Sequence, residues 1–236
     1  MSYDAVRAIP GKAQGDSAWL SDADVLRVHK PVNAALKRIF DIAASLSLIL
    51  LTLPLMLAIA GIIAVKDGMP ILFGHIRIGK DGEPFVCWKF RTMTRDADAQ
   101  LKALLARDPA ARQEWASNRK LREDPRIIPW IGSFLRKSSL DELPQLFNVL
   151  VGEMSMVGPR PVVVDELERY YGSTTGLYKS VRPGITGPWQ IGDRSNDSYE
   201  ARVAKDAAYI QKWSLREDVR IVLMTALVVV HRKGAY

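Results

Sequence analysis

Two adjacent carboxylates, Asp141 and Glu142, stand in the stretch whose residue types could best support chemistry. Arg136 and Lys137 come shortly before them, and a phosphate site requires basic neighbours of this kind. A carboxylate can act as a covalent nucleophile in phosphoryl transfer. Because the carboxylate and the phosphate are both anionic, cations must neutralise their repulsion. The pattern therefore agrees with a phosphoryl-transfer site.

The same residues also have a purely structural interpretation. Ser139, two residues and then Glu142 form a capping-box pattern ahead of an apolar run. In that case Asp141 and Glu142 would simply face the positive end of a helix dipole. Pro144, just after the first turn, is a poor residue for a helix that serves only structure. The residues alone leave both interpretations open.

The elements that must position these residues begin with a long apolar run. Ile42–Val65 is 24 residues long and carries no charge. As a helix it would reach about 36 Å at ~1.5 Å per residue, more than the ~30 Å hydrocarbon core of a bilayer. We therefore predict that it inserts into a membrane.

Two features of the run bear on how it inserts. Pro54 lies near its middle, where a proline removes a backbone hydrogen bond and bends a helix. Basic residues flank the run on both sides, whereas a spanning helix usually has one basic side. These features favour a bent, re-entrant helix that enters and leaves by the same face. A kinked spanning helix remains the alternative.

Composition excludes some classes of function. The net charge of +7 suits nucleic acid, an anionic membrane surface or a phosphorylated substrate. The basic residues are spread along the chain without a nucleic-acid-binding motif, so we predict no nucleic-acid partner. Cys87 is the only cysteine, and the three histidines lie far apart in sequence. The usual spacing of zinc ligands is therefore missing.

The region after the apolar run predicts a β-hairpin. Residues 71–78 and 84–90 are rich in apolar residues, and the five-residue link between them is rich in turn formers. Gly74–Lys80 matches the first seven positions of a P-loop, but Asp81 replaces the serine or threonine that would follow. Since the segment alternates like a strand, we predict a hairpin arm there.

The remaining regular segments are predicted to be helical. Residues 96–121 have a helical pattern with a break at Pro109, and Leu140–Leu150 is typical of a short apolar helix. Glu200–Trp213 is amphipathic. Ile221–Val230 is too short to span a membrane, but it suits the membrane interface or the core.

Five motif blocks give the chain a recognisable pattern. In order they are Lys37–Asp41, Lys89–Met93, Leu135–Asn148, Gly158–Pro161 and Arg182–Gly187. With them the chain closely resembles the bacterial monotopic polyprenyl-phosphate phosphoglycosyltransferases, which begin exopolysaccharide and O-antigen assembly. The resemblance covers about 200 of the 236 residues.

The resemblance implies a role for each motif. Asp141 resembles the nucleophile that forms a covalent phosphosugar-enzyme intermediate, with Mg²⁺ beside it. Glu142 resembles the partner acid that handles the proton of the incoming polyprenyl phosphate. Pro54 resembles the helix break of the re-entrant membrane helix. The resemblance places five arginines around the bound phosphates: Arg136, Arg160, Arg182, Arg91 and Arg194.

The resemblance also implies partners and a location. The enzyme would transfer a hexose-1-phosphate from a UDP-sugar to undecaprenyl phosphate and release UMP, at the cytoplasmic face of the bacterial inner membrane. The short form and the Gly234–Tyr236 ending look most like exopolysaccharide galactosyl-phosphate transferases. Galactose is therefore favoured, then glucose, and a homodimer is left open. A scaffold that has lost the chemistry is the alternative, and the intact Asp141–Glu142 pair argues against it.

Together these observations predict an α+β, mostly helical protein in three parts. A partly loose N-terminal segment covers residues 1–36, a re-entrant membrane helix covers 37–66, and a catalytic domain covers 67–236. In the catalytic domain, a short β-hairpin and amphipathic interface helices should surround a small catalytic core.

Overall fold

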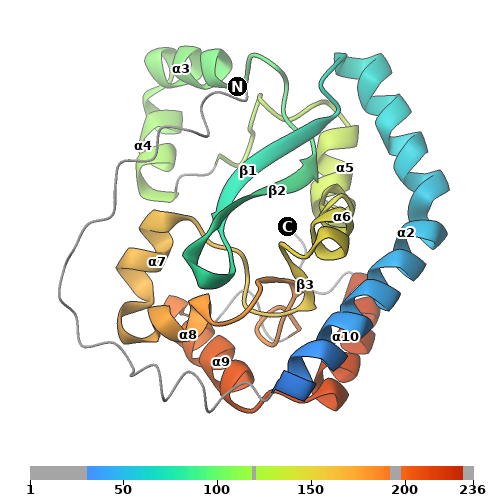
Figure 1. Cartoon of the computed structure of the whole chain (residues 1–236). Coiled ribbons are helices and arrows are strands. Elements are labelled where there is room, and N and C mark those ends of the chain that lie inside the picture. Colours follow the sequence, from blue (N-terminus) through green and yellow to red (C-terminus); the bar gives the residue numbers. More distant parts are fainter. Residues whose placement is uncertain (1–30, 119–120, 192–197, 231–236) are drawn as a thin grey trace.

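The computed structural model describes residues 31–118, 121–191 and 198–230. The predicted phosphate ligand Arg194, and all but the end of the N-terminal segment, lie outside these residues. The described part is mostly helical with a short β-hairpin, as predicted, and it begins with one long apolar helix (Figure 1).

That helix, α2 (Pro31–Asp67), has 37 residues and contains Pro54 within it. Its Ala34–Asp67 part is long and apolar enough to cross a membrane by length and composition. Thr52 Oγ1 donates to the Leu48 carbonyl (2.7 Å) one turn before the proline. Figure 1 shows α2 curving along one side of the molecule.

One face of α2 is buried along both halves of the helix. The buried positions recur at steps of three, four or seven residues, as one face of a helix requires, at Asp41, Ser45, Ile49, Met56, Ile59 and Ile63. The leucines between them are open, with Leu51 76% exposed and Leu57 64% exposed. The helix therefore presents a continuous apolar surface outward.

Each half of α2 packs on the same globular body. Ile49 joins a core cluster with α6 (Gln145–Val151), β3 (Ser155–Val157) and α10 (Leu215–Val230). Ile63, past the proline, joins a second cluster with α5 (Ile131–Ser138). Both ends of the helix thus lie against the globular body.

The predicted hairpin is confirmed. β1 (Leu72–Ile78) and β2 (Pro84–Phe90) pair antiparallel through the short turn η2 (Lys80–Gly82). The stretch that matched a P-loop is the β1 arm, as its alternation predicted.

The other elements surround the hairpin and the core. The break at Pro109 is confirmed, since α3 (Ala97–Arg107) ends and α4 (Pro109–Asn118) begins there. The amphipathic helix is confirmed as α9 (Tyr199–Gln211), and the last apolar run lies in α10. The rest are α7 (Val164–Tyr170), η4 (Gly172–Thr174), α8 (Thr175–Lys179) and β4 (Gly184–Thr186), which pairs in parallel with β3.

The capping-box interpretation of Ser139 is wrong. Ser139 has left-handed backbone angles (φ 57°), ends α5, and makes no capping hydrogen bond with its side chain. The predicted Leu140–Leu150 helix divides into a 3-10 turn, η3 (Leu140–Glu142), and α6. The two acids therefore lie in a turn between helices and not in the first turn of one long helix.

Candidate active site

The turn that carries Asp141 and Glu142 is built by the residues on either side of it. Ser139 leaves the helical region and stops α5. Pro144, with φ fixed near the helical value, stands at the start of α6, where its missing N–H costs little. The proline that would disturb one long helix instead begins a new one. Asp141 and Glu142 therefore lie in the turn between α5 and α6.

A lysine from the hairpin meets both carboxylates. Lys89 Nζ lies 2.6 Å from Glu142 Oε1 and 4.0 Å from Asp141 Oδ2. The Asp141 side chain is 13% exposed and that of Glu142 is 22% exposed, so both are shielded but reachable. Sequence reasoning missed Lys89 as a site residue. The available signal was its place in the Lys89–Met93 motif beside a predicted strand.

Burial governs the acidity of Asp141. It raises the pKa of the Asp141 carboxyl to about 6, and the negative charge of Glu142 adds to the rise. The charges of Lys89 and Arg136 act in the other direction. A carboxylate of this kind is mostly ionised at pH 7, and it lies in a place where additional positive charge would stabilise it.

A buried asparagine fastens β2 to α6. Asn148 is 1% exposed. Its Oδ1 accepts a hydrogen bond from the Trp88 amide (3.1 Å), and its Nδ2 donates to the Val86 carbonyl (2.7 Å). The side chain thus mimics a neighbouring strand for the residues just before Lys89. Because α6 directly follows the Asp141–Glu142 turn, this contact sets the position of Lys89 relative to the carboxylates.

Arg91 has a structural place. Its guanidinium donates to the Asp67 carboxylate and to the carbonyls of Asp67, Gly68, Pro70 and Met93. These contacts engage all five N–H groups of the guanidinium. Arg91 therefore clamps the end of α2, and no donor is left for the phosphate role that its motif predicted.

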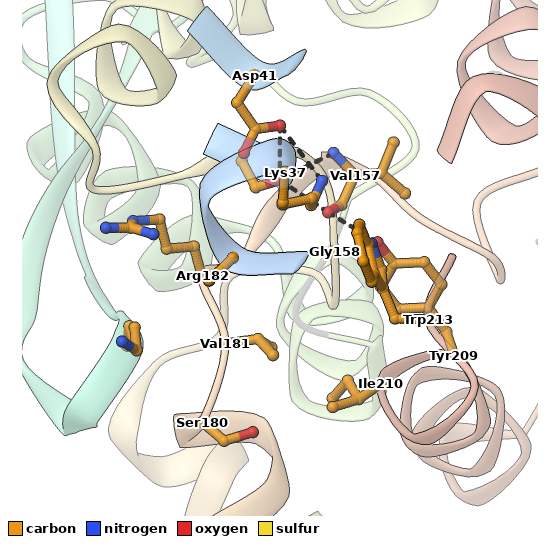
Figure 2. A pocket seen from close by; sticks show the side chains of 13 residues that line it. Lys37, Asp41, Val157, Gly158, Ser180, Val181, Arg182, Tyr209, Ile210 and Trp213 are labelled. Carbon is orange, nitrogen blue, oxygen red and sulfur yellow. Dashed lines mark hydrogen bonds and ion pairs between the residues drawn. The ribbon is translucent and has the colours of Figure 1, made fainter. Parts of the chain in front are cut away.

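Arg182 lies at the far end of α6 from the carboxylates. Its Nε donates to the Gly152 carbonyl (2.6 Å), just past the last turn of that helix. Figure 2 shows it in the wall of a pocket with Lys37, Asp41 and Trp213. The structure therefore does not bring Arg182 to the predicted phosphate site beside Asp141.

Of the two remaining predicted arginines that the structure describes, Arg136 lies near Asp141 and Arg160 lies against an aromatic ring. Arg136 is exposed in the last turn of α5, and its charge lowers the pKa of Asp141. Arg160 is half-buried, with its guanidinium carbon 6.0 Å from the centre of the Trp189 ring. The site around Asp141 therefore combines two carboxylates, one lysine and the accessible Arg136 guanidinium.

The family follows from comparison with known proteins. Residues 32–232 match the model of the family described as bacterial sugar transferase. The chain belongs to the bacterial sugar transferase family. The match contains the five motif blocks and the Asp141–Glu142 turn.

Three named proteins are similar to the chain over most of its length. It is 48% identical over 201 residues to undecaprenyl-phosphate galactose phosphotransferase of Salmonella typhimurium, covering 85% of this chain and 42% of the relative. It is 47% identical over 207 residues to exopolysaccharide production protein ExoY of Sinorhizobium fredii, covering 88% of this chain and 91% of the relative. A third relative, UDP-glucose:undecaprenyl-phosphate glucose-1-phosphate transferase of Klebsiella pneumoniae, is 36% identical over 214 residues, covering 87% of this chain and 42% of the relative.

The residues of this sugar transferase site fit the magnesium ion that the resemblance implies. Among the described residues, no three His, Cys, Asp or Glu side chains gather as a metal cluster. Mg²⁺ is usually held by one or two carboxylates together with substrate phosphates, so Asp141 with Glu142 provides a sufficient protein share. Burial of Asp141 without a full counter-charge also favours a cation there. When bound, the ion offsets the repulsion between Asp141 and a diphosphate.

Proposed function

We propose that this protein transfers a hexose-1-phosphate from a UDP-sugar to undecaprenyl phosphate and releases UMP. The observation that carries the proposal is the shielded Asp141–Glu142 pair held against Lys89. The relatives support it, since they include one named for galactose and one named for UDP-glucose as the sugar source, both with undecaprenyl phosphate. By its likeness to ExoY, the product would serve exopolysaccharide synthesis.

The proposed reaction has two transfers at one phosphorus atom. An oxygen of Asp141 attacks the phosphorus that bears the sugar, and the bond from that phosphorus to the oxygen of UMP breaks. UMP leaves, and the hexose-phosphoryl group stays on Asp141 as an acyl phosphate. A phosphate oxygen of undecaprenyl phosphate then attacks the same phosphorus, which restores the Asp141 carboxylate and yields the lipid diphosphate-sugar.

The neighbouring side chains divide the remaining tasks. Glu142 takes the proton of the acceptor phosphate when that phosphate arrives protonated. The Lys89 ammonium, 2.6 Å from Glu142 Oε1, keeps that carboxylate in place and adds positive charge beside the two phosphates. The exposed Arg136 guanidinium is suited to contact the phosphate that undergoes transfer.

Isotope labelling tests this mechanism. Incubation with UDP-sugar labelled in the sugar should release UMP once per active site and leave label on the protein without any lipid acceptor. Asp141→Asn should abolish both label and turnover while the fold is kept, because a neutral amide suits the buried position. If the wild type completes transfer with lipid but never carries label without it, direct transfer is the better account.

The identity of the sugar requires its own assay. We infer UDP-galactose first and UDP-glucose second, because the relatives are named for both sugars. UMP release measured against a panel of UDP-sugars at equal concentration decides between them. A preference for an N-acetylated sugar would contradict this assignment.

We further infer that the protein sits in one leaflet, at the cytoplasmic face of the inner membrane. The phosphate of the acceptor lies at the level of the lipid headgroups, so the active site must be at the membrane surface. Both halves of α2 pack on the globular body, and its outward leucines are exposed. A helix that crossed straight through a bilayer would carry one end away from that body, so a re-entrant helix fits better.

Cysteine labelling tests the re-entrant topology. Ala35 and Met69 flank the apolar run, and both are exposed. In a Cys87→Ser background, single cysteines at these positions should react with an impermeant reagent from the same, cytoplasmic side. Reaction from opposite sides would establish a spanning helix.

A further inference from the structure

The register of the hairpin puts three basic side chains on one of its faces. Lys89 pairs with Phe73, Cys87 with His75, and Phe85 with Arg77. Because directly paired and alternate residues point to the same side of a hairpin, Lys89, His75 and Arg77 share a face. Four residues separate the level of Lys89 from that of Arg77, about 13 Å along the strand. The row begins at the catalytic carboxylates and leads away from them.

Hydrogen bonds join the turn that carries Arg160 to the end of this row. The Ile78 amide donates to the Val162 carbonyl (2.9 Å). The buried Tyr178 hydroxyl donates to the Ile78 carbonyl (2.8 Å) and accepts from the Val162 amide (3.3 Å). Arg160, two residues before Val162, therefore lies near Arg77. Burial lowers the pKa of the Arg77 guanidinium, and the positive charge of Arg160 lowers it further.

Positive charge at the Arg77 end of this row, where Arg160 joins it, exceeds its counter-charge. Arg77 Nη1 lies 3.7 Å from Glu166 Oε2, a carboxylate that is 38% exposed. Arg77 Nη2 lies 3.2 Å from His75 Nδ1, and burial and the charges of Arg77 and Lys89 lower the pKa of that imidazole. Within the described residues, Arg160 faces a Trp189 ring and has no carboxylate partner. Of these two neighbouring guanidinium groups, only that of Arg77 has a carboxylate partner, and this partner is partly exposed.

We propose that this face of the hairpin binds the leaving nucleotide, with Arg77 and Arg160 together holding the phosphate that remains in UMP. The inference rests on the proposed function, because it places the transferred phosphorus at Asp141. The rest of the donor then needs positive charge at a distance from that residue, and Arg77 with Arg160, at the far end of the row, supplies it. The competing interpretation is that Arg77 and Glu166 form an ion pair that only ties β1 to α7.

Binding of UMP to the wild-type protein and its variants separates these interpretations, because UMP alone cannot turn over. Arg77→Ala should weaken UMP binding about tenfold or more, the size expected for a lost hydrogen bond between charged groups. Glu166→Gln should instead strengthen it severalfold, because the carboxylate that competes with the phosphate for Arg77 is removed. A purely structural ion pair predicts effects in the same direction for both variants.

A matched pair elsewhere provides the control. Arg220 Nη1 and Glu217 Oε1 form an ion pair of 2.8 Å on α10, and both side chains are exposed. Arg220→Ala and Glu217→Gln make the same charge changes there and should leave UMP affinity as in the wild type. A shift with these variants equal to that of the hairpin variants would show a general charge effect and overturn the proposal.

The remaining outcomes are equally decisive. If Arg77→Ala fails to fold, the exposed Glu166→Gln variant decides alone, and an unchanged or weaker UMP affinity overturns the proposal. If label stays on Asp141 while Arg77→Ala and Glu166→Gln both bind UMP as the wild type does, the nucleotide site is wrong and the proposed function holds. Arg77-dependent UMP binding without any label on Asp141 keeps the site and removes the proposed mechanism.

Discussion

The Lys89 ammonium lies 2.6 Å from Glu142 Oε1, although 53 residues separate the two in the chain. The lysine comes from the end of a β-strand and the glutamate from a turn between two helices. Neither local structure fixes this distance by itself. The buried Asn148 side chain, which binds the backbone of β2 from within α6, joins the two parts.

Replacement of Lys89 should slow transfer strongly. Lys89→Met keeps most of the apolar stem but removes the charge beside both carboxylates, so we expect a loss on the order of 10²-fold in turnover. Lys89→Arg should recover part of the rate, because the charge returns with a different geometry. Lys80→Met, at the exposed hairpin tip, is the control and should behave as the wild type. Full activity of Lys89→Met in a UMP-release assay would remove Lys89 from the site.

Arg91 and Arg136 should give opposite results. Arg91→Ala leaves several buried acceptors at the end of α2 without their donor, so we expect a loss of about 3–5 kcal/mol in stability. The KM for the UDP-sugar should change little in the protein that remains folded. Arg136→Ala removes an exposed side chain near Asp141, so it should raise the KM for the UDP-sugar and leave the stability nearly unchanged. Thermal melts and initial rates on both variants test this, and a raised KM with normal stability for Arg91→Ala would restore its phosphate role.

Local sequence patterns predicted those elements whose structure a single local feature determines. The hairpin follows from alternation and a turn-rich link, and the helix break follows from Pro109. The pattern at Ser139 has two physical outcomes, because a residue that can cap a helix start can also adopt a left-handed angle and end the preceding helix. Only the packing of α5 against α2 and β2 decides between them, and that packing is tertiary. β3 and β4, three residues each, are too short for periodicity to show.

The sequence could predict the two carboxylates of the candidate site and Arg136, but not where Lys89, Arg91 and Arg182 lie. The motif around Asp141 points directly to the proposed nucleophile. A sequence shows that Arg91 and Arg182 are arginines, but not that backbone carbonyls occupy the donors of Arg91 and hold the Nε of Arg182. The same holds for Lys89, whose contact with Glu142 depends on how the hairpin docks on α6.

The buried aspartate of α9 should make stability depend on pH. Burial raises the pKa of Asp206 to about 7, against the opposing charge of Arg202. The folded protein therefore binds this proton more tightly than the unfolded chain. The resulting stability is complete below about pH 4, the ordinary range of an aspartate, and is lost as the pH rises through 7. At most about 4 kcal/mol is at stake across that window.

Asp206→Asn tests this directly. An amide stays neutral at every pH. The melting temperature of the variant, relative to that of the wild type, should therefore increase as the pH rises from 5 to 8. Asp81→Asn, at a side chain that is 71% exposed, should follow the pH dependence of the wild type. Parallel curves for wild type and Asp206→Asn would show that this carboxyl ionises normally in the fold.

Arg160→Ala should harm activity far more than stability. The turn that carries Arg160 is fixed by its backbone, since the Gly158 amide donates to the Thr186 carbonyl (2.9 Å) and the Gly184 amide donates to the Pro159 carbonyl (2.8 Å). Gly158 itself has no room for a side chain, because a Cβ there would lie 2.6 Å from the Arg182 carbonyl oxygen. The Arg160 side chain takes no part in these contacts, so its removal leaves the turn in place.

The size of the expected effect follows from that rigidity. A guanidinium held in a fixed direction beside a phosphate stabilises the transition state without reorganising, and its loss should reduce the rate on the order of 10²-fold. Arg160→Lys should recover only part of it, because an ammonium cannot bind two phosphate oxygens in parallel. The rates are to be measured at saturating UDP-sugar and magnesium, with melting temperatures of the same preparations as the control. If Arg160→Ala retains a normal rate, the turn serves packing alone and the phosphate must be held by other cations.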